Sequence, residues 1–172
     1  MKKPLALILI MLLASCSNTT VEPKTVSATD GLATVRLVNP HDFTDIETGN
    51  FGIQSDFEQS VANKLAEALA DHFKETDGTI DITFTNIDLA GETRFNTQEI
   101  RVLKDLYIPR MSFEYVFKDV AGNVMLADTV DIKDMGYLSK RLTGREANDS
   151  IGYDTRMLIE YFEEVLKKVN KT

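Results

Sequence analysis

Acidic and basic side chains gather in one stretch of the chain, between two segments that alternate apolar and polar residues. Carboxylates can transfer protons or bind cations, and guanidinium groups can bind a carboxylate or phosphate. The charged positions of interest are Asp88, Glu92, Arg94, Arg101, Asp105 and Arg110. We expect residues 90–109 to form a long connection that brings these side chains to one end of a sheet. They would either contact a ligand or partner there or, in the interpretation we favour, form ion pairs that fix the connection to the sheet.

An enzymatic interpretation would use Asp88 and Glu92 as acid and base, with Arg101 or Arg110 holding an anion. No other catalytic pattern supports it, because the chain has no Gly-x-Ser-x-Gly turn and no glycine-rich phosphate loop. The two histidines, at positions 41 and 72, do not have the spacing of metal ligands. We therefore expect a protein that is not an enzyme and needs no metal or cofactor.

Cys16 is the only cysteine, and it follows an apolar run that begins after Lys2 and Lys3. The run is shorter than the roughly 20 residues that a membrane-spanning helix needs. Small residues directly before the cysteine are typical of a lipoprotein signal. We predict that residues 1–15 are removed as a signal peptide and that Cys16 carries lipid, such as palmitate. Ser17, rather than an aspartate, indicates the outer membrane of a Gram-negative bacterium, with the domain facing the periplasm.

The formal net charge of the whole chain is −8. This acidity argues against a general nucleic-acid binder and against a broad contact with anionic lipid. We expect the lipid, rather than a charged surface, to hold the protein at the membrane. Residues 16–30 are mostly polar and should be a flexible tether, followed by one periplasmic domain over residues 31–172.

Periodicity predicts the elements that position the charged stretch. Residues 32–38 should form a strand, and a helix should follow a capping box formed by Ser55 and Glu58. Residues 79–89 should form a strand with a bulge near Thr85 and Asn86, where the alternation slips by one residue. Residues 110–118 and 124–132 should form a hairpin, and residues 154–169 a final amphipathic helix. We expect Asp128, on a mostly apolar face of the second hairpin strand, to lie near an edge of the sheet.

This order, β-α-β-β-β-α, predicts an α+β fold. The expected architecture is a two-layer sandwich, with a four-stranded mixed sheet and two helices on one of its faces. Phe113, Tyr115 and Phe117 share one face of a strand. They could line a lipid pocket, but such a stripe is typical of a core packed against helices, which is what we expect here.

Several motifs of the chain resemble a family of proteobacterial lipoproteins called domain of unknown function 3016. The resemblance rests on residues 88–92, on residues 107–111, on the hairpin turn at residues 119–123, and on Tyr137 and Leu138 before a final helix with Met157 and Leu158. It covers residues 32–169 and implies no known activity. A weaker, architectural resemblance is to the lipopolysaccharide-assembly lipoprotein that plugs an outer-membrane translocon.

These observations predict a non-enzymatic lipoprotein that binds another envelope protein or assists envelope assembly. The alternative is a carrier or chaperone of an apolar ligand or lipid. Enzymatic use of Asp88 and Glu92 is the third interpretation.

Overall fold

The computed structural model describes residues 23–48, 52–95 and 99–169. The strands are β1 Thr25–Asp30, β2 Ala33–Val38, β3 Thr79–Asp88, β4 Glu92–Phe95, β5 Glu99–Val102, β6 Arg110–Lys118 and β7 Val124–Lys133. The α-helices are α1 Gln54–Phe73 and α2 Gly152–Val169. Short 3-10 turns lie at η1 Pro40–Asp42, η2 Tyr137–Ser139 and η3 Glu146–Asn148.

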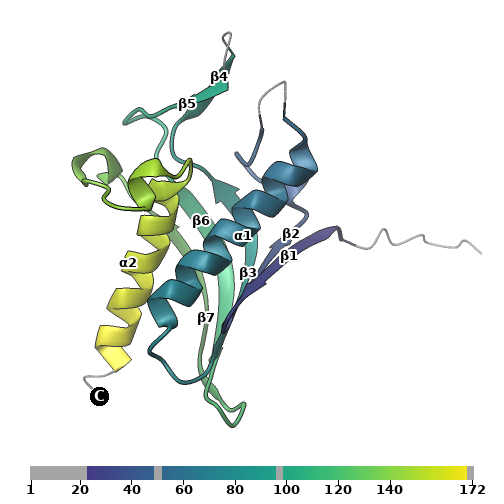
Figure 1. Ribbon diagram of the computed structural model, residues 1–172, viewed down its shortest axis with the longest axis vertical. Coiled ribbons are helices and arrows are strands. Elements are labelled where there is room, and N and C mark those ends of the chain that lie inside the picture. Colours follow the sequence, from purple (N-terminus) through teal and green to yellow (C-terminus); the bar gives the residue numbers. More distant parts are fainter. Residues whose placement is uncertain (1–22, 49–51, 96–98, 170–172) are drawn as a thin grey trace, which may run out of the picture.

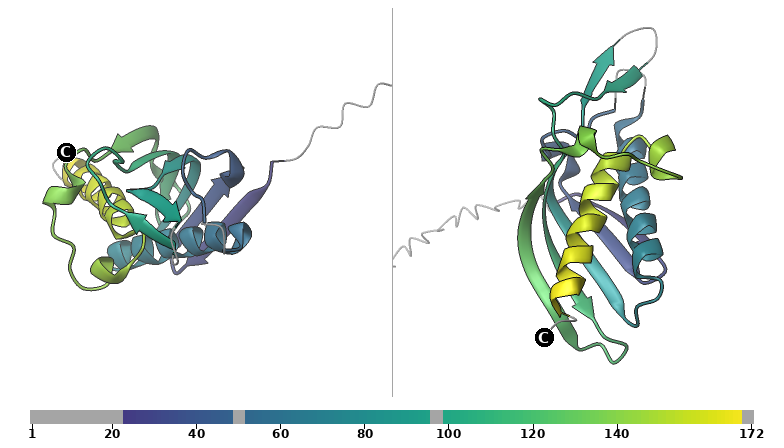
Figure 2. Two further views of the ribbon diagram at one scale, coloured as in Figure 1. Left: turned by 90° about the horizontal axis from the view of Figure 1, so that it is seen from above. Right: turned by 90° about the vertical axis from the view of Figure 1, so that its left-hand side faces the viewer.

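Five of the strands form one sheet in the order β1-β2-β3-β6-β7, in which only the β2–β3 pair is parallel. Strands β4 and β5 pair with each other as a separate hairpin. In Figure 2 both helices lie on one side of the five-stranded sheet. The chain is therefore α+β, as predicted, with a mixed sheet.

The prediction of four strands in the order β-α-β-β-β-α is wrong. The fifth strand of the sheet is β1, which lies in the segment that we assigned to the tether. Only Val26 and Ala28 of this strand are apolar and buried, too few to give a recognisable alternation. The long connection 90–109, in which we predicted no strand, contains the β4–β5 hairpin.

The predicted start of the first helix is wrong in detail. The helix begins at Gln54, and its N-cap residue, Ile53, makes no capping hydrogen bond through its side chain. Glu58 does not reach back to Ser55. It is buried and instead accepts hydrogen bonds from Lys24 at 2.8 Å and Gln54 at 3.2 Å.

The core fills the space between the sheet and the two helices. Leu65 and Leu69 of α1 are fully buried, and Phe73 meets Phe162 of α2 edge-on at 5.6 Å between ring centroids. The aromatic stripe of β6 is buried in the same core, which confirms our expectation for it. The register of β3 against β6 shifts between Phe84 and Asn86, which confirms the predicted bulge.

Candidate functional site

The charged stretch lies at one end of the sheet, where the β4–β5 hairpin projects from the body of the domain (Figure 1). Arg101 on β5 joins the hairpin to the body. Its guanidinium donates to both carboxylate oxygens of Asp45, at 2.9 and 3.0 Å. It also donates to the backbone carbonyls of Leu89, Ala90 and Gly91, at 3.2 to 3.3 Å.

Arg101 is only 11% exposed, and its guanidinium is occupied by partners in the same chain rather than open to a ligand. A bidentate arginine–carboxylate pair fixes orientation as well as position. The backbone at Gly91 contributes to the same close packing. A Cβ there would lie 2.8 Å from the carbonyl oxygen of Val102, and Gly91 has a φ of +88°, which favours glycine. The base of the hairpin is thus held by both side-chain and backbone contacts.

Asp154 lies beneath this brace, in the first turn of α2, and is 1% exposed. One carboxyl oxygen accepts a hydrogen bond from the amide of Ala90 at 2.9 Å, and the other has no hydrogen-bond partner. Burial raises the pKa of Asp154 to about 7, although the Ala90 amide and the charge of Arg101 act in the opposite direction. The buried acid is therefore protonated below neutral pH.

The other predicted charged residues form two pairs at the same end. Arg110 donates to Asp88 at 2.6 Å, and Lys104 lies 3.9 Å from Glu92. These contacts fit the ion-pair interpretation of the stretch, and Asp88 and Glu92 face different cations rather than a shared site. Asp105 is exposed in the segment after β5.

Two predicted positions cannot be placed as side chains. Arg94 pairs with Ile100 through the backbone of the hairpin, and its side chain lies outside the described part of the structure. Cys16 lies outside the described residues altogether, so its lipidation remains a prediction.

Asp45 and Asp154 were not predicted as partners of the charged stretch. Asp45 lies in a loop 56 residues before Arg101, and Asp154 is 64 residues after Ala90. A signal existed for Asp154: an acid in the first turn of an amphipathic helix, on the side of Leu158. Its burial could not be read from the sequence, because acids are also common at exposed helix starts.

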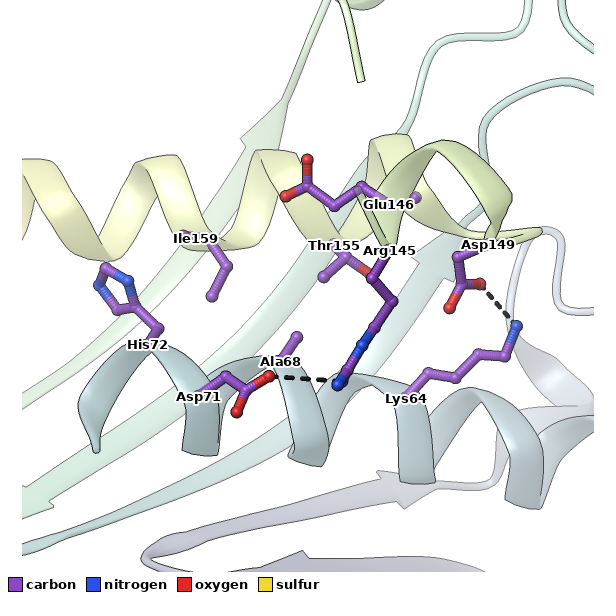
Figure 3. A pocket seen from close by; sticks show the side chains of 10 residues that line it. Lys64, Ala68, Asp71, His72, Arg145, Glu146, Asp149, Thr155 and Ile159 are labelled. Atoms are coloured by element: carbon purple, nitrogen blue, oxygen red, sulfur yellow. Dashed lines mark hydrogen bonds and ion pairs between the residues drawn. The ribbon is translucent and has the colours of Figure 1, made fainter. Parts of the chain in front are cut away.

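A second polar site lies between α1 and the segment leading into α2, a pocket of about 290 Å³ (Figure 3). Its cations are paired with acids across the pocket. Arg145 reaches over to Asp71 of α1 at 3.3 Å, and Lys64 donates to Asp149 at 2.5 Å. These pairs link α1 to the segment that leads into α2, and each of these two cations faces an acid rather than a free site for an anion.

His72 also lines this pocket, and burial lowers its pKa despite the nearby charge of Glu163. Among the described residues, no group of three or more histidine, cysteine or acidic side chains is arranged to hold a metal ion. No helix in that same part of the chain has the length and apolar character to span a membrane.

The space between α2 and the sheet bears on the carrier interpretation. A void there, lined by Phe117, Leu126 and Phe162 among others, has a volume of about 10 Å³. This is at the lower limit for a single water molecule and far below the size of an acyl chain.

The fold and the site define a small acidic α+β domain whose charged residues brace a projecting hairpin. The chain belongs to the family described as "Protein of unknown function (DUF3016)", whose sequence model matches residues 31–164. No curated protein and no solved structure matches the chain. The likeness to the lipopolysaccharide-assembly lipoprotein rested on an element order that the structure revises.

Proposed function

We propose that this protein is a non-enzymatic, lipid-anchored binding module of the cell envelope, which contacts another envelope protein through the β4–β5 hairpin. The observation that carries this proposal is the Arg101 brace. An isolated two-stranded hairpin is only marginally stable in water. Here it is tied to the body by one largely buried guanidinium, which donates to four acceptor groups.

The nature of the charged end supports binding rather than catalysis. Its arginines are paired with acids of the same chain: Arg101, largely buried, with Asp45, and Arg110, at the surface, with Asp88. Exposed apolar side chains flank this end, with Leu106 74% exposed and Met135 74% exposed. Exposed apolar groups next to a rigid polar element are typical of protein contact surfaces.

The anchor proposed from Cys16 would place the domain at the periplasmic face of the outer membrane. The segment before β1 would then set the distance that the hairpin can reach. A carrier of an apolar ligand receives less support, because the void under α2 holds about 10 Å³.

The test is photo-crosslinking in intact cells with a photo-reactive residue placed at Thr93 or Val102 of the hairpin. The matched control position is Thr83, on the sheet face that the helices do not cover. We expect both hairpin positions, and not the control, to capture the same envelope protein. Equal capture at all three positions, or none at the hairpin, would contradict the proposal.

A further inference from the structure

The outer edge of β7 is a second surface at which a partner could bind. The strand has ten residues and ends the sheet, with β6 on its inner side. The amide of Thr129 donates to the side chain of its own neighbour, Asp128, at 2.8 Å. This amide therefore points away from β6. Because backbone direction alternates along an antiparallel strand, Ala127 and Asp131 also present their amides and carbonyls outward.

The opposite edge of the sheet, β1, is shorter and partly covered. Strand β1 has six residues, and α1 packs along it. Gln59 of α1 donates to the carbonyl of Ser27, so part of the β1 edge is already occupied. Short edge strands and covering elements are the usual protection against pairing with another chain. On β7, which has ten residues, Asp128 caps the amide of Thr129, and the other charged residues, Asp131 and Lys133, are exposed on the opposite face of the strand.

The surface beside β7 is apolar and incompletely covered. Leu126, Val130 and Ile132 point to the helix side of the sheet and are only partly buried. Tyr161 and Val165 of α2, also partly buried, lie on the neighbouring helix. In Figure 1, α2 lies in front of the sheet and extends past β7 on that side. A strand added outside β7 would therefore lie behind α2 and could cover the apolar side chains.

One charge interrupts this apolar row and indicates what the added strand must contain. Asp128 is opposite Tyr115 in the register and so faces the helix side, between Leu126 and Val130. It is exposed in the free protein and would be covered by an added strand. A covered carboxylate is costly unless it meets a cation or hydrogen-bond donors.

We propose that the outer edge of β7 binds an extended segment of another protein by strand addition. The segment has apolar residues opposite Leu126, Val130 and Ile132, and a lysine or arginine opposite Asp128. Backbone hydrogen bonds supply affinity in this mode of recognition, and alternate side chains supply specificity. This inference concerns a different surface from the β4–β5 hairpin and does not depend on the function proposed for it.

A second copy of this chain does not meet the requirement. Opposite residues in an antiparallel pair point to the same face, so the cation must lie on the same face as Asp128. The basic residue of β7, Lys133, is an odd number of positions away and lies on the other face. Pairing of two β7 strands would therefore leave Asp128 opposite an apolar or acidic residue, and the net charge of −8 on each chain opposes it further.

The test uses the full-length protein and a synthetic peptide that alternates valine and threonine. One valine is replaced by lysine at the position opposite Asp128 when the peptide lies antiparallel to β7. Binding is followed by NMR titration, with slowed hydrogen exchange expected at the amides of Ala127, Thr129 and Asp131. Replacing the peptide lysine by glutamate should weaken binding about tenfold or more.

Three variants of the protein separate strand addition from other binding. Thr129→Pro removes an outward amide without removing a bond to β6, and should abolish binding, whereas Thr129→Ala should retain it. Asp128→Lys should reverse the preference, so that the glutamate peptide binds more tightly than the lysine peptide. This reversal remains informative if Thr129→Pro fails to fold.

Absence of peptide binding at about 1 mM would overturn the proposal. Binding that Thr129→Pro leaves unchanged, or a preference that Asp128→Lys does not reverse, would overturn it as well. A concentration-dependent dimer lost in Thr129→Pro would replace the proposed partner with a second copy of this chain.

Discussion

The buried carboxyl of Asp154 should make the stability of this protein decrease as the pH rises from about 4 to about 7. Its pKa in the folded protein is about 7, against 3.8 for the free side chain. Between these values the folded protein holds a proton that the unfolded chain releases, so rising pH favours the unfolded chain. Above about pH 7 both states are ionised, and the effect is constant. Each unit of pKa corresponds to 1.36 kcal/mol, so the full loss is about 4 kcal/mol.

Asp154→Asn should abolish this dependence. The amide oxygen can still accept the hydrogen bond from Ala90, and the amide nitrogen replaces a protonated oxygen that also has no partner. At pH 4 the variant and the wild type should have nearly equal free energies of unfolding. At pH 7.5 the variant should be more stable by about 4 kcal/mol.

The measurement is urea unfolding of the purified proteins at a series of pH values, followed by circular dichroism. The matched control is Asp105→Asn, which removes an exposed carboxyl at the same end and should leave the pH dependence of the wild type in place. A difference between Asp154→Asn and the wild type that stays constant from pH 4 to pH 8 would refute the reasoning. It would mean that Arg101 compensates the ionised carboxylate fully.

Three other substitutions test the core, the brace and the anchor. Leu65→Ala should lower the free energy of unfolding by about 2–5 kcal/mol because this side chain is fully buried, and a change near zero in urea unfolding would show that the helix face is misassigned. Arg101→Met should lower the free energy of unfolding by about 3 kcal/mol, because Asp45 and three carbonyls lose the guanidinium that donates to them. It should also speed hydrogen exchange in β4 and β5. Unchanged exchange in these strands would mean that Arg101 does not hold the hairpin. Cys16→Ser should release the protein from membranes or leave it unprocessed, with its circular dichroism spectrum unchanged; a processed variant that fractionates with membranes would contradict the proposed lipid anchor.

Local patterns in the sequence predicted the elements whose signal is long and regular. The α1 stripe, the β3 bulge, the β6–β7 hairpin and α2 all follow from periodicity and turn residues. β1 escaped detection because its six residues include only two buried apolar side chains. β4 and β5 escaped because four-residue strands without a face in the main core carry little alternation.

The sequence predicted that the charged residues would gather at one end of the sheet, but not which hydrogen bonds Arg101 would make. The proximity of Asp88 and Arg110 could be predicted, because they lie at the end of β3 and the start of β6, which pair in the sheet. The partners of Arg101 could not be inferred in this way. Asp45 comes from a loop with no periodic signal, and the three carbonyls are backbone groups that any sequence would supply.

Two places in the described part of the chain bear on function, and they differ in kind. At the charged end, Asp45 and Arg101 form an ion pair, and the unsatisfied group is the buried carboxyl of Asp154, one oxygen of which has no hydrogen-bond partner. At β7 the backbone is available on the outside, and Asp128 guards only the amide of Thr129. Residues that break local rules are expected at functional sites. Because the charges at the first site are used internally, substitutions there should act mainly through stability and the position of the hairpin. Side-chain substitutions on the outer edge of β7, such as Asp128→Lys and Thr129→Ala, should instead leave stability nearly unchanged. Measuring stability and binding for each such variant therefore assigns it to one site or the other.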